Sequence, residues 1–462
     1  MPVSEKEMSA WCEKLLAGSA AEPNLTLSDY IRAIPGMASL QDVPSGTAVL
    51  VRGDVDAKPG ANIGDGDIRL RSMVDTLQFG QTRGWKQIVF GHIGRKPEGS
   101  LNKVAKRLGE IMKCDVPLIA DWLDESTMTI LPAAQLQIAA AKPGAILMLE
   151  NTRKYDIERA LWKAKSADVP KLSSNLAKLA NEFADKLGKI FIFEAFSAGS
   201  PDACSVVVPA AMSKVALGEY VTHEFTQPLM RCLDAQLVVF SGLKADKLDD
   251  MEAMINRGKI TRVIAAGALS GALRKAAAQL DGKECCLGIA EDPNKKDLPI
   301  YVPESRLEQA RKMIAEGRKK GIKFFLPVDF VIQGGSVVDN LKPSDEQFDV
   351  GPKTNALFEE AVGEFLKLGG AVAFYNGVFG MFEDPRFEGG TKRFIPQIKR
   401  MTDSGVEVYV GGGEGGAALE KYGQENWATH VFTAGGTVLN ALGSEPVPYM
   451  VALRAAALKD NK

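Results

Sequence analysis

Charged side chains follow several short apolar runs in the first half of this 462-residue chain. They are Arg52, Asp54, His92, Arg95 and Arg153. Arg69 follows in the nearby segment DGDIRLR. A guanidinium group presents a planar set of donors that matches a carboxylate or a phosphate. A single arginine often pairs with a local surface carboxylate, but several at the ends of successive runs predict a site for a compact anion.

Glycines take the corresponding places in the second half. In VEVYVGGGEGGAALEKYG, residues 406–423, an apolar run meets Gly411, Gly412, Gly413 and Glu414 before an alanine-rich helix. Backbone N–H groups at a helix start attract anions, and glycine has no Cβ to keep a phosphate away. A tight turn would explain one such loop, but five follow apolar runs in this half. We therefore expect space for a polyphosphate, which Glu414 would bind indirectly through Mg²⁺.

The elements that position these residues alternate along the chain. Short β-branched runs, about five before residue 215 and about five after 235, are each followed by an amphipathic stretch. This alternation predicts βαβ units, and fully apolar runs such as QIVF (87–90) are typical of parallel strands buried on both faces. We expect an α/β fold with two doubly wound parallel-sheet domains, residues 1–214 and 235–440, joined by a hinge helix over 215–234. Ligands of such sheets bind at the carboxyl ends of the strands.

Composition excludes several other classes of protein. The chain has 56 Lys and Arg against 58 Asp and Glu, and this balance predicts no general attraction to nucleic acid or to an anionic membrane. The six cysteines lack C-x-x-C spacing, and the first residues show neither a signal peptide nor a membrane span. We therefore expect a cytoplasmic protein. A Walker A loop is absent from the sequence, and so is a G-x-G-x-x-G pattern with its downstream acid, so neither a P-loop NTPase nor a Rossmann dehydrogenase is supported.

Together these features suggest phosphoryl transfer across a closing cleft, and at this point the sequence resembles a known family. The matching stretches include VRGDVDAKPG, GHIGRKPEG, LMLENTRKY, FEAFSAG, SGLKADK, DVGPKT, YNGVFGMFED and YVGGGEGGAALEKYG. From about residue 25 to the C-terminus, and in the same order, they resemble phosphoglycerate kinase. The resemblance implies a cytoplasmic monomer that transfers a phosphoryl group between 1,3-bisphosphoglycerate or 3-phosphoglycerate and ADP or ATP. It also implies that residues 441–462 return to the first domain.

The resemblance assigns residues to two ligands. It places 3-phosphoglycerate against Asp54, Asp56, Arg69, His92, Arg95 and Arg153. It places the nucleotide and Mg²⁺ against Lys244, Lys247, Asn376, Glu383, Gly411, Gly412, Gly413 and Glu414. Arg69 and Lys244 are the expected catalytic residues, because phosphoryl transfer to a carboxylate needs cationic stabilisation and no general base. Residues 1–24 lie outside the resemblance, and we expect a short amphipathic helix there.

Several positions depart from the family pattern. Ser200 and Pro201 replace a histidine and an arginine, so one cationic partner of the substrate phosphate is missing. Asp56 replaces an asparagine and adds negative charge beside an anionic substrate. Three hypotheses follow: a working kinase, a paralogue that binds nucleotide or phosphoester as a regulatory or structural subunit, or a kinase for a different acyl phosphate.

Overall fold

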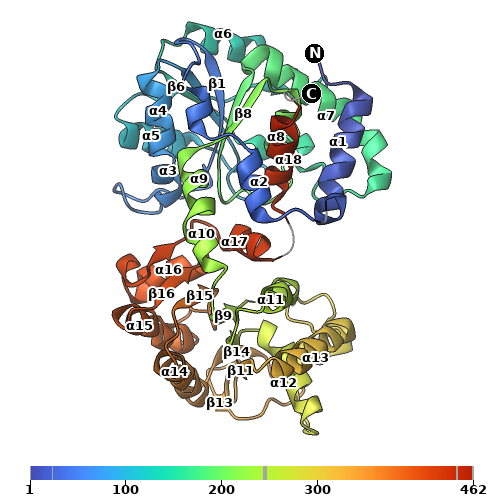
Figure 1. Ribbon diagram of the computed structural model, residues 1–462, viewed down its shortest axis with the longest axis vertical. Helices are drawn as coiled ribbons and strands as arrows, with labels where there is room; N and C mark the ends of the chain where they lie inside the picture. Colours follow the sequence, from blue (N-terminus) through green and yellow to red (C-terminus); the bar gives the residue numbers. More distant parts are fainter. Residues whose placement is uncertain (1, 23, 243–246, 444–445, 460–462) are drawn as a thin grey trace. The chain divides into compact units, whose positions relative to one another are not determined.

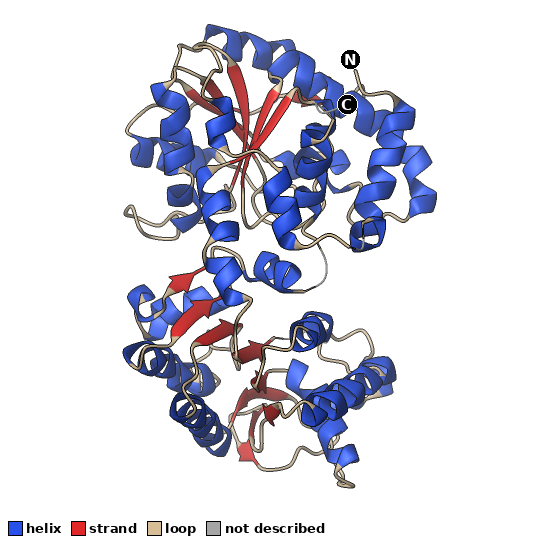
Figure 2. Ribbon diagram, viewed as in Figure 1, coloured by secondary structure: helices blue, strands red, loops and turns tan. Residues whose placement is uncertain are grey.

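The computed structural model describes residues 2–22, 24–242, 247–443 and 446–459. The chain forms two compact units, which consist of residues 1–226 with 445–462 and of residues 227–444. In each unit, helices cover both faces of a six-stranded parallel sheet (Figures 1 and 2). The predicted fold class is therefore confirmed.

The sheet of unit 1 has the strand order β3-β6-β2-β1-β7-β8, and all of its pairs are parallel. Its strands are β1 (Ala48–Gly53), β2 (Lys86–Phe90), β3 (Leu118–Ile119), β6 (Ile146–Leu149), β7 (Ile190–Glu194) and β8 (Lys214–Leu217). The chain first places β2, β3 and β6 on one side of β1 and then adds β7 and β8 on its other side. Doubly wound sheets bind ligands in the crevice at such a reversal. In unit 1 this crevice is therefore expected at the carboxyl ends of β1 and β7.

Helices and one small hairpin complete unit 1. The helices are α1 (Glu5–Ala17), α2 (Leu27–Ala33), α3 (Ile68–Ser72), α4 (Val74–Thr82), α5 (Asn102–Met112), α6 (Pro132–Ala140), α7 (Val169–Glu182), α8 (Ala203–Val206), α9 (Glu219–Thr226) and α18 (Pro448–Ala457). The hairpin consists of β4 (Leu123–Asp124) and β5 (Thr129–Ile130). Helix α18 contacts α2, α8 and β8, so the end of the described chain belongs to unit 1 (Figure 1).

Helix α1 confirms the amphipathic helix expected before residue 25. Ser4 and Glu7 form a capping box at its start, which satisfies backbone N–H groups there. Its buried face contains Met8 and Trp11 and packs against α7. The indole N–H of Trp11 donates to the backbone oxygen of Val206 at 2.8 Å, so this extra segment is fixed to unit 1.

The main sheet of unit 2 has the order β11-β10-β9-β15-β16-β17 and is also parallel. Its strands are β9 (Leu237–Ser241), β10 (Arg262–Ala266), β11 (Lys323–Phe325), β15 (Val372–Asn376), β16 (Glu407–Val410) and β17 (His430–Val431). A separate antiparallel sheet contains β12 (Phe330–Ile332), β13 (Val337–Val338) and β14 (Gln347–Val350). Here the chain order reverses between β9 and β15.

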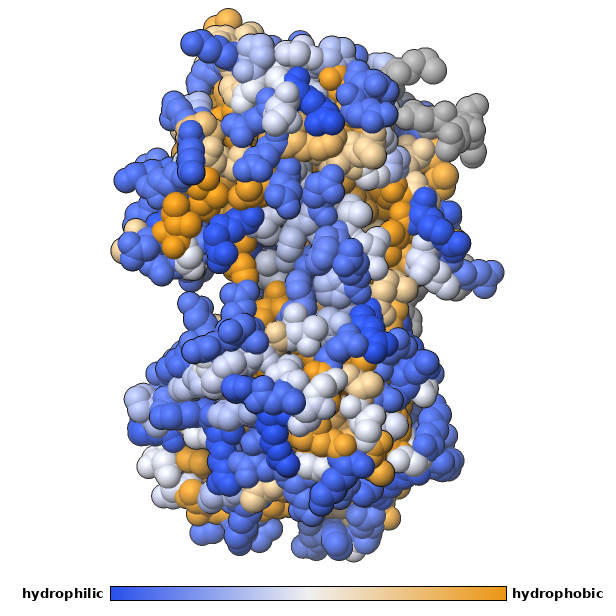
Figure 3. All heavy atoms as spheres, turned by 60° about the vertical axis from the view of Figure 1, so that its left-hand side comes forward, coloured by the Kyte–Doolittle hydropathy of each residue, from blue (hydrophilic) through white to orange (hydrophobic). Residues whose placement is uncertain are grey.

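The helices of unit 2 cover its main sheet. They are α10 (Pro228–Cys232), α11 (Lys247–Asn256), α12 (Leu269–Leu280), α13 (Glu304–Lys319), α14 (Pro352–Lys367), α15 (Gly389–Asp403), α16 (Glu414–Tyr422) and α17 (Gly435–Leu442). On the face shown in Figure 3, hydrophilic side chains cover most of the surface of each unit. Within the described ranges, every helix is too short or too polar to cross a membrane.

One prediction about a single element is wrong. The segment 215–234 is not one helix, because its first residues complete β8 and the rest forms α9 and α10. Pro228 begins α10 after a break at Gln227, since proline has no N–H to continue the preceding helix. The run KFFLPVDFVI forms two strands in different sheets, β11 and β12, which flank Pro327.

Candidate functional site

In unit 1, the carboxyl ends of the strands bring the predicted residues together around Asp54. This aspartate follows β1 and is 2% exposed. It accepts hydrogen bonds from the hydroxyl and the backbone N–H of Ser197, at 2.6 and 3.2 Å. The Nε atom of Arg69 lies 3.8 Å from Oδ1 of Asp54. Asp54 therefore links the loop after β7 to the cation on α3.

Arg69 also contacts Asp56. Its Nη1 atom donates to the backbone oxygen of Asp56 at 2.8 Å and to Oδ2 at 3.1 Å. Burial alone would raise the pKa of Asp56, but the Gly94 N–H and Arg69 together hold it below its ordinary value. Arg95 is exposed and pairs with no carboxylate in the described part of the chain. Arg69 and Arg95 are thus the accessible cations of this edge.

Three other basic side chains of this edge converge on a carboxylate that the sequence did not single out. Arg153 donates from Nη2 to both oxygens of Asp202, at 3.1 and 3.0 Å. Nδ1 of His92 lies 2.9 Å from Oδ2 of Asp202, and Nη2 of Arg52 lies 3.8 Å from it. Arg52, His92, Arg153 and Asp202 are each at most 7% exposed, and we call them the Asp202 cluster.

Burial and charge oppose each other in the Asp202 cluster. Burial disfavours the ionised form of Asp202, but His92, Arg153 and Arg52 outweigh it and lower its pKa to about 2. Burial also lowers the pKa of His92, so this imidazole is neutral at neutral pH. Nearby Glu158 is fully buried, and its pKa is raised to about 7 by burial and by the negative charge of Asp202.

In unit 2, the predicted residues lie at the carboxyl ends of β9, β15 and β16. Asn376, the last residue of β15, is 4% exposed, and its amide has no hydrogen-bond partner among the described residues. The Nζ atom of Lys247 donates to the backbone oxygen of Ser241 at the end of β9 (3.3 Å). The first turns of α16 and α17 follow β16 and β17, and their N–H groups lack intrahelical acceptors. Amide, ammonium and helix-start N–H donors together suit an anionic ligand.

The positions at this edge are occupied by glycine for different physical reasons. The prediction that all of these glycines clear space for a ligand is wrong. A Cβ on Gly411 would lie 2.4 Å from Oδ1 of Asn376, and one on Gly412 would lie 2.0 Å from the backbone oxygen of Phe432. Gly412 is therefore required by the backbone packed against it, whereas a Cβ on Gly411 would displace the side chain of Asn376. Gly413 and Gly436 meet nothing within 4 Å, so they leave open space. Gly413 also has a φ of 73°, which favours glycine.

The remaining predicted residues of unit 2 are exposed or outside the described ranges. Glu414, the first residue of α16, and Glu383 are both exposed. Lys244 lies outside the described residues. Within those residues, no group of three or more His, Cys, Asp or Glu side chains is placed to hold a metal ion. A single carboxylate oxygen of Glu414 fits Mg²⁺ only if nucleotide phosphates and water supply the other ligands, which is the usual manner of Mg²⁺ binding.

The sequence did not identify Asp202, Trp162 or Gly436 as site residues. The indole N–H of Trp162 donates to Oδ1 of Asp202 at 2.8 Å, and its ring packs 4.5 Å from the guanidinium carbon of Arg153. A signal for Asp202 existed, because an aspartate directly follows the position where the family pattern loses its arginine. Its convergence with three basic side chains depends on tertiary packing, which the sequence does not display.

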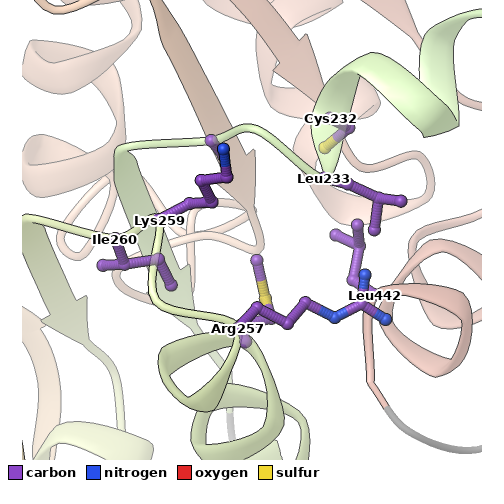
Figure 4. Close-up of a pocket in the computed structure, with 8 residues that line it drawn as sticks. Cys232, Leu233, Arg257, Lys259, Ile260 and Leu442 are labelled. Carbon is purple, nitrogen blue, oxygen red and sulfur yellow. The ribbon is translucent and has the colours of Figure 1, made fainter.

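The pocket shown in Figure 4 is structural. It is lined by residues including Cys232, Lys259 and Leu442, and its volume of about 10 Å³ holds no more than one water molecule. Arg257 donates from Nη2 to the backbone oxygens of Ala441 and Gly443, at 3.1 and 2.8 Å. These bonds satisfy carbonyl groups at the end of α17.

Comparisons with known proteins agree with the fold and with the order of the motifs. Residues 40–445 match the family model described as "Phosphoglycerate kinase". The chain is 27% identical over 427 residues to phosphoglycerate kinase of Clostridium beijerinckii, covering 90% of this chain and 98% of that protein. It is 29% identical over 441 residues to the enzyme of Latilactobacillus sakei, with the same coverage. The crystal structure of phosphoglycerate kinase from Pyrococcus horikoshii OT3 matches with a TM-score of 0.70 and 21% identity, covering 92% of this chain and all of that one. Because the family model spans most of its length, this chain belongs to the phosphoglycerate kinase family.

Proposed function

We propose that this protein is a working phosphoglycerate kinase, which transfers a phosphoryl group between ATP and the carboxylate of 3-phosphoglycerate. One observation carries the proposal beyond family membership. Each unit presents an anion site at the carboxyl edge of its parallel sheet, and the two sites differ in chemistry. Unit 1 offers arginines, whereas unit 2 offers backbone N–H groups, an amide and a lysine.

The acid substrate binds to unit 1 in this proposal. Arg95 is exposed and free of carboxylate partners within the described residues, so it can contact the substrate without first breaking an ion pair. Arg69 keeps 22% of its side chain exposed while Asp54 and Asp56 orient it. We assign it to the transferring oxygens, where a positive charge stabilises the transition state. His92 and Arg153 bind the phosphate end of the acid.

The nucleotide binds to unit 2 in this proposal. The first turns of α16 and α17 attract phosphates, and the open faces of Gly413 and Gly436 let them approach. Lys247 and Asn376 add donors, and Gly411 and Gly412 hold the loop in shape. Glu383 is assigned to the nucleoside, and Lys244 remains the predicted second catalytic cation.

The reaction is a direct displacement at the γ-phosphorus. A carboxylate oxygen of the acid forms a bond to phosphorus as the bond to the ADP oxygen breaks, which gives an acyl phosphate and ADP. The attacking oxygen is already ionised, so no residue has to remove a proton. Bound Mg²⁺ would neutralise charge on the nucleotide phosphates, with Glu414 as its protein-side acceptor.

A coupled steady-state assay with ATP, Mg²⁺ and 3-phosphoglycerate tests the proposal. Arg69→Ala should lower kcat by at least about a hundredfold, since it removes a charged contact to the transferring group. Arg71→Ala is the matched control, because Arg71 lies on the same helix and pairs with Asp67 at 2.9 Å. Nucleotide binding without turnover in the unmodified protein would contradict the proposal and support a binding subunit or a different acid substrate.

The assembly and location of the protein belong to the same proposal. We infer a cytoplasmic monomer from the resemblance to phosphoglycerate kinase. Light scattering of the purified protein at micromolar concentration should give a mass near 49.7 kDa. A value near twice that mass would contradict the monomer.

A further inference from the structure

The Asp202 cluster combines three basic side chains with a carboxylate from the same chain. Arg52, His92 and Arg153 come from or directly follow β1, β2 and β6, three neighbouring strands of the sheet. Asp202 reaches them from the loop after β7. Its two oxygens receive hydrogen bonds from Arg153 and Trp162, and Nδ1 of His92 and Nη2 of Arg52 lie 2.9 and 3.8 Å from Oδ2.

The guanidinium groups of the cluster are largely engaged with the protein. Arg52 donates to the Ser205 hydroxyl at 2.7 Å and to the backbone oxygen of Gly53 at 2.6 Å. Arg153 donates from Nη1 to the backbone oxygen of Gly94 at 2.6 Å. Among the guanidinium nitrogens of Arg52 and Arg153 in the described structure, Nε of Arg153 alone is buried without an acceptor. An incoming anion would therefore find few free donors here.

The two contacts of the His92 ring nitrogen Nδ1 cannot both be hydrogen bonds. This nitrogen lies 2.9 Å from Nη2 of Arg52 and 2.9 Å from Oδ2 of Asp202. One ring nitrogen cannot accept a hydrogen bond from Arg52 and donate one to Asp202 at the same time. A neutral imidazole satisfies one neighbour only, so the contact of His92 with Asp202 is weaker than its distance suggests.

The charges of the cluster are nearly balanced without any ligand. Arg52 and Arg153 contribute two positive charges, and Asp202 contributes one negative charge. Glu158, which is buried beside the cluster, adds a further negative charge when it is ionised. A phosphate bound by these basic side chains would meet the carboxylate of Asp202 at short range, and like charges in a buried site repel strongly.

We propose that Asp202 is a specificity-determining residue, an internal anion that lowers the affinity of this protein for the phosphate end of its acid substrate. The inference rests on the proposed function and adds a property to the same site. The same acid without a phosphate escapes the repulsion. Asp202 therefore reduces the ratio between the affinity of unit 1 for a phosphorylated acid and its affinity for an unphosphorylated one.

Calorimetric titration of two acids tests this inference. The probes are 3-phosphoglycerate and glycerate, its analogue without the phosphate, and the proteins are the unmodified chain, Asp202→Asn and Asp202→Ala. Both variants should bind 3-phosphoglycerate at least about tenfold more tightly, because a repulsive charge is removed, and glycerate with less than about threefold change. Glu22→Gln is the control, since it breaks another ion pair of unit 1, to Arg454 at 2.7 Å, and should change neither affinity.

Equal gains for both acids, or weaker binding of 3-phosphoglycerate, would overturn the inference. If neither variant folds, the unmodified protein still decides the question. It should prefer 3-phosphoglycerate to glycerate by less than about tenfold, and a preference above about a hundredfold would contradict the role of Asp202. These binding ratios do not depend on turnover, so they separate a failure of this inference from a failure of the proposed function.

Discussion

Arg69 and Asp56 are joined at two atoms of the aspartate, its carboxylate and its backbone oxygen. The backbone contact does not depend on the side chain at position 56, whereas the ion pair at 3.1 Å does. The carboxylate of Asp56 therefore neutralises part of the positive charge of Arg69. An asparagine could keep the geometry without that charge.

Asp56→Asn should lower the KM for 3-phosphoglycerate by about three- to tenfold. The pKa of Asp56 is below its ordinary value, so the residue is ionised at neutral pH and repels an anionic substrate. Steady-state kinetics at two ionic strengths would measure the effect, which should shrink as salt screens the charge. Asp124→Asn is the control, because within the described residues the side chain of Asp124 bonds only to its own hairpin, at Ser126 and Thr127. An unchanged or higher KM would show that Asp56 does not oppose substrate binding.

Glu158 should make the stability of unit 1 depend on pH between about 4.5 and 7. Its pKa in the folded protein is about 7, above its ordinary value of 4.5. The folded state therefore binds this proton more tightly than the unfolded state. The stabilisation is complete below pH 4.5 and is lost as pH rises through 7, by up to about 3 kcal/mol. Asp202, with a pKa of about 2, stays ionised throughout this window.

Glu158→Gln tests this dependence, because glutamine does not titrate. Thermal unfolding at pH 5 and pH 8 should show a smaller loss of stability in the variant than in the unmodified protein. Glu110→Gln is the matched control, since Glu110 is an exposed glutamate of the same unit. Parallel pH profiles for the unmodified protein and Glu158→Gln would contradict the prediction.

Gly412→Ala should destabilise unit 2 by more than about 2 kcal/mol. The new Cβ would lie 2.0 Å from the backbone oxygen of Phe432 and 2.6 Å from the carbonyl carbon of Thr433, and neither backbone atom can move aside easily. Urea unfolding followed by circular dichroism would measure the loss. Stability equal to that of the unmodified protein would mean that this turn is open in solution.

Gly436→Ala should instead spare stability and weaken nucleotide binding by about tenfold or more. Nothing lies within 4 Å of a Cβ at this position, and alanine favours a helix over glycine by up to about 1 kcal/mol. The added methyl group would stand where a phosphate approaches the first turn of α17. Calorimetric titration with MgATP measures the affinity. Gly363→Ala, in the middle of α14, is the control, and an affinity equal to that control would remove Gly436 from the site.

The sequence predicted most of the architecture because the central strands are buried on both faces. β1, β2, β9 and β15 stand out as apolar runs, and the helices between them repeat at helical spacing. Edge elements were harder to predict. β3 has two residues, and β8 begins the segment that was predicted as a helix. Short strands carry too little pattern to distinguish them from neighbouring helices.

The candidate site was predicted less completely than the fold. Strand ends identified Asp54, His92 and Arg153, since side chains at the carboxyl edge of a parallel sheet converge. Arg69 came instead from the segment DGDIRLR, whose end forms the start of α3. Residue types alone could not show that Asp202 contacts His92 and Arg153, which follow two of these strands. They also could not separate Gly412, which the backbone of another loop requires, from Gly436, which faces open space. Both distinctions depend on contacts between segments far apart in the chain.

The measurement that tests the central claim most directly identifies the product. The unmodified protein is incubated with ATP labelled at the γ-phosphate, Mg²⁺ and 3-phosphoglycerate, and hydroxylamine is added to trap acyl phosphates as hydroxamates. The account predicts a hydroxamate of 3-phosphoglycerate that forms with both substrates present, together with equimolar ADP, and that is lost in Arg69→Ala. ADP release without hydroxamate, or no reaction under saturating substrates, would contradict transfer to a carboxyl group.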